Sequence, residues 1–236
     1  MKNNRNPLLR ISGSLILFVL LASYSHLTAG PNTKQPQAEF VPMFNGEDLA
    51  DWGGEGKTKV NGYVWANGML EATPSCRYLM TDKSYSDYIL EFEFKLTPGA
   101  NNGLGIHYPG KGNPAYTGME IQIIDGEHEK YRGKLKDFQH HGSLYHLKPA
   151  LRGYTKPAGE WNFQRVTVKG PKVTVDLNGT RILDADLNEI SQKHHKRKNA
   201  TRRSGKIVFC GHNTAIYVRN MRIAELAPTQ APEEAK

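Results

Sequence analysis

The sequence predicts an all-β fold, a sandwich of antiparallel strands, and three observations carry this prediction. Roughly a dozen short runs of apolar and β-branched residues recur along the 236-residue chain. Glycine, proline and asparagine separate these runs, and Asn67-Gly68 and Asn178-Gly179 are typical hairpin turns. No segment of ten or more residues keeps its apolar side chains at a helical period.

Residues 88–96 form the clearest strand, because aromatic and aliphatic side chains alternate there with charged ones. A period of two predicts an antiparallel strand with one buried face and one solvated face. Residues 161–169, 172–177 and 180–183 show similar runs joined by tight turns, so we expect them to form a meander.

The N-terminal residues 1–29 have the composition of a secretory signal peptide. Lys2, Arg5 and Arg10 precede an apolar run over residues 11–21, and small and polar residues follow it. That run is too short to span a membrane. We therefore expect an exported protein, periplasmic or secreted, with no membrane span.

The rest of the chain divides by composition. Residues 30–38 include proline, glutamine and lysine and have no apolar run to bury, so we interpret them as a linker. Residues 39–226 carry all the expected strands and form one domain. Residues 227–236 are rich in proline and glutamate, so we expect a disordered tail.

The formal charge of +8 is unevenly distributed. Three positive side chains lie in the signal segment and six lie in residues 193–203, so the remaining chain is close to neutral. The basic run contains no aromatic residue, whereas nucleic-acid surfaces interleave the two types. We expect no nucleic-acid partner and interpret the run as a solvated loop, attraction to an acidic polymer being the lesser alternative.

Two cysteines, Cys76 and Cys210, are far apart in the sequence. Export permits a disulfide between them, and two buried free thiols are an equal alternative. The spacing of cysteine and histidine does not match a zinc site, and no metal ligands are assigned.

Residues 116–126 are the candidate functional strand. Strict alternation places Glu120 and Gln122 on one face, and a β-bulge at residues 123–124 would turn Asp125 to the same side. The alternative is a solvated strand face with incidental acids. The Glu-x-Gln-x-x-Asp spacing resembles the Glu-x-Asp-x-x-Glu strand of jelly-roll endo-β-glucanases. Gln122 and the shorter Asp125 disfavour a retaining mechanism with two carboxylates.

A set of motifs, in order along the chain, resembles the family of 3-keto-disaccharide hydrolases. The resemblance covers residues 40–226 and implies a concanavalin A-like jelly-roll sandwich of two antiparallel sheets. The motifs are residues 44–49 with Trp52, 79–83, 88–94, 116–125, 142–145, 159–162, 177–179 and 218–223.

The resemblance implies cleavage of glycosides already oxidised at C3 by a separate sugar 3-dehydrogenase. A C3 ketone acidifies the C2 hydrogen, so a base can remove it, the glycosidic oxygen can leave C1, and water can add. This chemistry needs a base near C2, a donor at the C3 oxygen and an acid for the leaving oxygen. A divalent cation is a possible cofactor of this chemistry, and no other cofactor is implied.

Carried over by position, Glu120, Asp125 and His212 are the expected catalytic residues. Either Glu120 or a histidine takes the C2 proton, and Asp125 orients a histidine or serves the leaving group. Gln122 is expected to bind a sugar hydroxyl or the C3 oxygen.

Four further residues are expected to contact substrate, namely His107, His141, Tyr145 and Arg219. Pairing of Arg219 with an acid across the sheet is the alternative for that residue. The sequence departs from the family at His107, where many members carry arginine. It also departs at residues 209–212, where Phe-Cys-Gly-His replaces the usual Leu-Gln-Asp-His. Two alternative functions stay open, a non-catalytic carbohydrate-binding module and a conventional β-glucan hydrolase.

Overall fold

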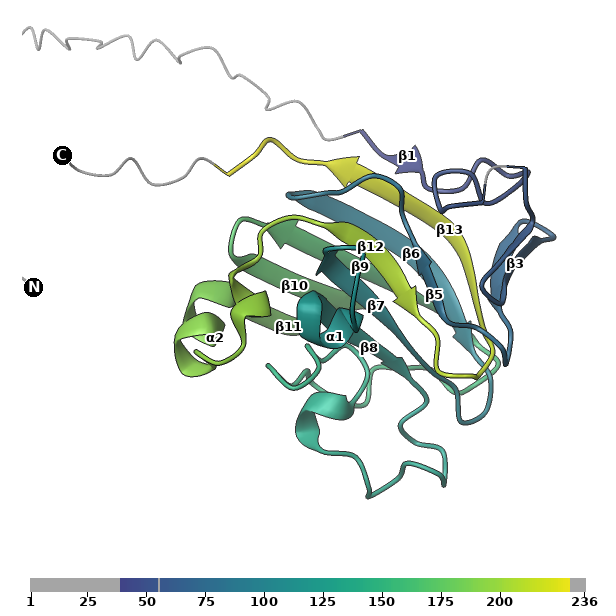
Figure 1. The fold of residues 1–236 in the computed structure, drawn as a ribbon. Coiled ribbons are helices and arrows are strands. Elements are labelled where there is room, and N and C mark those ends of the chain that lie inside the picture. The colour runs from purple at the N-terminus through teal and green to yellow at the C-terminus, as the bar shows by residue number, and fades with distance from the viewer. Residues whose placement is uncertain (1–38, 55, 230–236) are drawn as a thin grey trace, which may run out of the picture. The chain divides into compact units, whose positions relative to one another are not determined.

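The computed structural model describes residues 39–54 and 56–229, and these fold as two packed antiparallel β-sheets (Figure 1). The all-β prediction is confirmed. The predicted signal peptide, residues 1–29, and the linker, residues 30–38, lie outside the described residues.

The larger sheet has nine strands in the order β11-β10-β9-β6-β13-β4-β3-β2, and β1 also pairs with β13. All the strand pairs in it are antiparallel. The strands are β1 (Val41–Pro42), β2 (Lys59–Val60), β3 (Tyr63–Ala66), β4 (Met69–Ala72), β6 (Tyr88–Leu96), β9 (Trp161–Lys169), β10 (Lys172–Leu177), β11 (Thr180–Asp186) and β13 (Ile216–Glu225).

The smaller sheet has four strands in the order β5-β12-β7-β8. They are β5 (Tyr78–Met80), β7 (Asn101–Tyr108), β8 (Met119–Ile124) and β12 (Lys206–Cys210). Short helices connect the strands: α1 (Pro114–Thr117), η1 (Asp137–Gln139), α2 (Leu187–Lys193) and η2 (Lys198–Thr201).

Both predicted Asn-Gly hairpins are present. Asn67 and Gly68 have φ of 53° and 69°, and Asn178 and Gly179 have φ of 50° and 88°. Two successive positive φ angles match the twist of the paired strands, and asparagine followed by glycine tolerates them best. These turns join β3 to β4 and β10 to β11.

The core lies between the sheets, where Phe92 and Phe94 of β6 and Leu104, Ile121 and Phe209 of the smaller sheet are fully buried. Each such side chain contributes about 1.5–3 kcal/mol to the free energy of unfolding. The alternation of apolar and charged residues over 88–96 therefore predicts the buried face of β6 correctly.

The opposite face of β6 differs from the expectation. Glu91 is only 1% exposed, because the guanidinium groups of Arg165 and Arg222 lie on either side of its carboxylate. A face that was predicted to be solvated is thus covered by ion-paired arginines from the neighbouring strands.

The basic run, predicted as a loop, includes the end of α2 and all of η2. Asp186 caps α2 by accepting hydrogen bonds from the backbone N–H groups of Asn188 and Glu189, and Leu187 and Ile190 are buried beneath it. A helix of seven residues is too short to show a sustained period in the sequence.

The first residues of the predicted tail, 227–229, contact the domain. The backbone N–H and the hydroxyl of Thr229 donate to Asp87 at 2.6 and 2.8 Å. Residues 227–229 are therefore held against the domain, and residues 230–236 lie outside the described part.

The two cysteines, Cys76 and Cys210, are buried free thiols. Of the two alternatives left open by the sequence, the structure has the reduced one.

Candidate functional site

Strand β8 is regular, so the expected β-bulge is wrong. Its pairing with β7 runs without a shift from Met119 opposite Ile106 to Ile124 opposite Asn101. The backbone N–H of Asp125 then donates to Ala100 O at 2.9 Å, which continues the ladder past the end of the strand. No extra residue is available to turn Asp125 toward Glu120.

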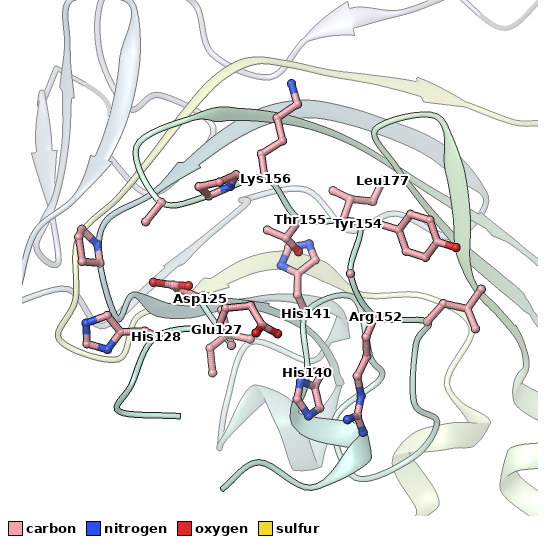
Figure 2. Close-up of a pocket in the computed structure, with 17 residues that line it drawn as sticks. Asp125, Glu127, His128, His140, His141, Arg152, Tyr154, Thr155, Lys156 and Leu177 are labelled. Carbon is pink, nitrogen blue, oxygen red and sulfur yellow. The ribbon is translucent and has the colours of Figure 1, made fainter. Parts of the chain in front are cut away.

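Asp125 instead borders a separate hollow of about 460 Å³, formed by the loops around residues 125–128 and 151–158 (Figure 2). Its carboxylate accepts a hydrogen bond from Gly99 N at 2.9 Å. The predicted grouping of Asp125 with Glu120 and Gln122 is therefore wrong, and its carboxylate stabilises a turn.

Glu120 and Gln122 do share a cleft, of about 260 Å³, on the outer face of the smaller sheet. This is just below the range of ~300–1,000 Å³ typical of drug-sized ligands, and suits a site that encloses one sugar ring. Its lining combines acid, amide, aromatic and histidine side chains: Tyr78, Asn101, Asn113, Pro114, Ala115, Tyr116, Glu120, Gln122, Ile124, Tyr131, Leu135, Gln139, Tyr145, Cys210 and His212.

The centre of the cleft is a carboxylate–imidazole pair. His212 Nε2 lies 3.4 Å from Glu120 Oε1, although 92 positions separate the two residues. Glu120 is 4% exposed, whereas the side chain of His212 is 45% exposed at the mouth of the cleft. A buried carboxylate beside an accessible imidazole can transfer a proton to or from a bound molecule.

Gly103 of β7 makes room for the Glu120 carboxylate. A Cβ atom at this position would lie 1.9 Å from Glu120 Oε1 and 2.6 Å from its Cδ. Glycine within a strand often marks such a close approach. Gly103 and Gly105 within one strand predict a close approach by another backbone or a ligand, and at Gly103 the neighbour is a carboxylate side chain.

Two amide oxygens in the cleft are buried without a protein partner, Gln122 Oε1 and Asn101 Oδ1. An unpaired buried acceptor costs about 1–3 kcal/mol. A ligand with hydroxyl groups would satisfy both, so the cleft is suited to a polyol.

Two further lining groups are protonated at neutral pH. Burial raises the pKa of the Tyr78 phenol, with Cys210 and Glu120 adding to the effect. Burial likewise raises the pKa of the Cys210 thiol well above its usual range, and the Glu120 charge contributes. The Tyr78 hydroxyl is thus available as a hydrogen-bond donor.

Helix α1 forms one wall of the cleft. The Asn113 side chain accepts from Ala115 N at 2.9 Å, and Pro114 occupies the first turn, which is a favourable start for a helix. The helix presents Tyr116, which is 49% exposed. Sequence analysis missed this residue because four helical residues leave no periodic signal.

Of the predicted contact residues, Tyr145 lies in the cleft. Its backbone N–H donates to Glu120 O at 2.8 Å, and its ring packs against Phe138 and His146. The structure therefore brings Tyr145 together with Glu120, and its contact with substrate stays a prediction.

His107 and His141 do not line this cleft, so the structure does not bring them together with Glu120, and their contact with substrate stays a prediction. His107 is 1% exposed, with φ of 52°, at a register shift between β7 and β12. His141 stacks on Phe94, its Nε2 lies 2.9 Å from Gln164 Oε1, and it borders the hollow that contains Asp125 (Figure 2). Burial lowers the pKa of each histidine to about 4, so both rings are neutral at pH 7.

Arg219 lies on the other sheet, on β13. Its Nε donates to Glu93 Oε2 at 2.8 Å, and its guanidinium lies 3.9 Å from the centre of the Trp161 ring. The alternative of pairing with an acid across the sheet is observed, and Arg219 does not line the cleft; its contact with substrate stays a prediction.

Within residues 39–54 and 56–229, no three His, Cys, Asp or Glu side chains converge as a metal site. In the same part of the chain, none of the helices has the length and apolar composition needed to cross a bilayer.

Comparison with known proteins places this chain in a family. A family model described as a 3-keto-alpha-glucoside-1,2-lyase-like domain matches residues 39–224. A 3-keto-disaccharide hydrolase of Bacteroides thetaiotaomicron is 27% identical over 170 residues, which are 63% of this chain and 59% of that protein. The match thus spans less than two thirds of that relative.

Two crystal structures from Parabacteroides distasonis, each provisionally named a glycosyl hydrolase, share the fold. One has a TM-score of 0.70 at 23% identity, over 80% of this chain and 100% of the other. The second has a TM-score of 0.68 at 24% identity, over 80% and 94%. These structures share the sandwich of two antiparallel sheets, and the chain belongs to the family of 3-keto-alpha-glucoside-1,2-lyase-like domains.

Proposed function

We propose that this protein cleaves 3-keto-glycosides, disaccharides or glucosides, by removing the C2 proton, eliminating the C1 substituent and hydrating the product. The observation that carries the proposal is the Glu120–His212 pair, which lies in a cleft that also holds unpartnered amide oxygens. The family and the name of its Bacteroides relative support a carbohydrate-active hydrolase.

The reaction needs one base and one acid within reach of adjacent carbons. Loss of the C2 proton gives an enolate whose charge rests on the C3 oxygen. The enolate expels the oxygen at C1, which takes up a proton, and leaves an enone with a C1–C2 double bond. Water then adds at C1, and a proton returns to C2.

The cleft supplies groups for these steps. Glu120 is the proposed base at C2, because it is the buried carboxylate of the pair, and His212 at the mouth protonates the leaving oxygen. The protonated Tyr78 hydroxyl and the Gln122 amide are placed to donate to the C3 oxygen. Asp125 has no role in this scheme, since it lies outside the cleft.

The direct test compares Glu120→Gln with Asp125→Asn in an assay of 3-keto-cellobiose and 3-keto-glucosides. General-base catalysis contributes about 10²–10⁴-fold, so Glu120→Gln should lose at least about 100-fold in kcat. Asp125→Asn should stay within about tenfold of the parent, because the reaction does not use it.

The outcomes separate the candidate functions. Retention of activity within about tenfold in Glu120→Gln removes that residue as the base. Binding of unoxidised sugars, with no turnover of any keto-sugar, indicates a carbohydrate-binding module instead. Release of glucan fragments by the parent indicates conventional glucan hydrolysis. Repeating the assay with a chelator tests the expected cation requirement.

We further propose that the protein is exported by residues 1–29 and acts after a sugar 3-dehydrogenase has oxidised its substrate. In those residues, positively charged side chains precede an apolar run, and this order supports export. Cell fractionation and the mass of the mature N-terminus test it: an intact Met1 on cytoplasmic protein would refute export.

A further inference from the structure

A positively charged surface adjoins the cleft at Tyr116. This residue borders both the cleft and a second, shallow hollow, which is lined on its other side by Lys198, Asn199, Thr201 and Arg202. A ligand that fills the cleft and extends past Tyr116 would therefore reach the basic run.

The basic run is held firmly against the cleft wall. The Asn199 amide donates to Gly118 O at 2.7 Å, directly before β8, and both Asn199 and Ala200 are buried. The backbone of η2, which carries Lys198 and is flanked by Arg197 and Arg202, is therefore anchored to the segment between α1 and β8. A merely solvated loop would not need this anchor.

Arg197 does not line the second hollow but directly precedes η2 and contacts Tyr116, which does line it. Its guanidinium lies 4.9 Å from the centre of the Tyr116 ring, and its Nη1 is buried without a hydrogen-bond partner. No described carboxylate forms an ion pair with Arg197, Lys198 or Arg202. The nearby acid Asp186 is already paired with Lys172 at 3.1 Å.

We propose that Arg197, Lys198 and Arg202, called here the cationic rim, bind an anionic group on the leaving part of the substrate. Phosphate, sulfate or carboxylate supplies acceptor oxygens and negative charge, and these three cations have no ion-pair partner among the described carboxylates. Tyr116 lies between rim and cleft and provides a flat surface for the ring that links them. This inference rests on the proposed function and assigns its substrate class: 3-keto-glycosides with an acidic leaving group.

The test uses aryl 3-keto-glucosides that differ in one substituent, a hydroxymethyl, carboxylate, sulfate or phosphate group. The parent, Arg197→Gln and Lys193→Gln are compared. Lys193 is exposed on the same run and does not border the hollow. Its replacement therefore controls for the long-range electrostatic effect of removing one positive charge. Within one substrate pair, comparing variants cancels the intrinsic reactivity of the leaving groups.

For Arg197→Gln, the ratio of kcat/KM on anionic to neutral substrate should fall by about tenfold, the effect of losing one charged hydrogen bond. In Lys193→Gln the ratio should not change. Arg202→Gln, at an exposed position, should lower the ratio too and covers the case in which Arg197→Gln fails to fold. The anion for which Arg197→Gln lowers this ratio most, relative to the parent, identifies the group.

The proposal that the cationic rim binds an anion is refuted if the ratio of kcat/KM on anionic to neutral substrate is unchanged in both Arg197→Gln and Arg202→Gln. It is also refuted if Lys193→Gln lowers this ratio as much as they do. A parent that cleaves no keto-glucoside refutes the proposed function, not the rim. Binding of cellobiuronic acid against cellobiose, measured by NMR titration, then decides. The parent should bind cellobiuronic acid more tightly than cellobiose, and Arg197→Gln should bind the two equally. If the parent and Arg197→Gln show the same preference, the cationic rim does not bind the acid and the proposal is refuted.

Discussion

The substitution Gly103→Ala tests how the cleft holds its central carboxylate. The added Cβ would lie 1.9 Å from Glu120 Oε1, whereas ordinary contact needs about 3.5 Å, so the carboxylate must retreat by roughly 1.5 Å. A misplacement of ~1 Å in catalytic geometry costs about 100-fold in rate. We expect kcat on a 3-keto-glucoside to fall at least about 100-fold, with overpacking lowering the free energy of unfolding by about 1–3 kcal/mol.

The matched control is Gly54→Ala. Its Cβ would lie 2.6 Å from Val60 Cγ2 and 2.7 Å from Leu49 Cβ, so it crowds the protein comparably without bordering the cleft. It should lose similar stability in urea denaturation and keep its activity. If both variants lose activity equally, crowding and not the position of Glu120 explains the loss.

The double variant Gly103→Ala/Glu120→Gln sharpens this test. Because Gly103 acts through Glu120, the double variant should be no slower than Glu120→Gln alone. If the loss of kcat in the double variant equals the product of the losses in the two single variants, Gly103 affects the reaction by a route other than the position of Glu120. This result would refute the proposed role of Gly103.

Three further predictions concern the body of the domain. His107 and His141 have pKa values of about 4 when folded, against 6.5 when exposed, so the unfolded chain takes up protons first as the pH falls. The free energy of unfolding should therefore decrease between pH 6.5 and 4 by about 3 kcal/mol per histidine, and urea titrations of His141→Gln should show a smaller decrease. Glu91→Ala removes the acceptor shared by two half-exposed arginines and should cost about 1–3 kcal/mol in the same assay, with kcat unchanged; a stabilised variant would contradict this. Cys76 and Cys210 should resist iodoacetamide in the native state, and a reducing agent should leave Tm unchanged; a Tm lowered by reductant would indicate a disulfide.

The features that the sequence predicts correctly depend on neighbours along the chain. The alternation of residues 88–96 fixes which face of β6 is buried, and Asn67-Gly68 carries its own turn preference. The solvation of Glu91 was mispredicted because it depends on arginines from two strands that are distant in sequence. Arg219 was misassigned for the same reason, since Glu93 and Trp161 come from neighbouring strands.

The position of Asp125 shows most clearly what a local sequence pattern cannot predict. Whether a strand contains a bulge depends on its partner, and here the backbone of Ala100 continues the ladder to Asp125 without interruption. Nothing within residues 116–126 encodes that pairing. The spacing of acids therefore predicted the strand and its outward face but not the turn at its end.

The site is built across the sheet and not along one strand. β7 supplies the gap at Gly103, β8 supplies Glu120, and the segment after β12 supplies His212, and these three strands are neighbours in the order β12-β7-β8. In an antiparallel sheet, side chains on one face of adjacent strands lie within about 5 Å of each other, so a cleft on that face takes one residue from each strand. A motif along β8 consequently contains only one member of the Glu120–His212 pair. Its partner is found by asking which histidine the adjacent strands bring to the same face.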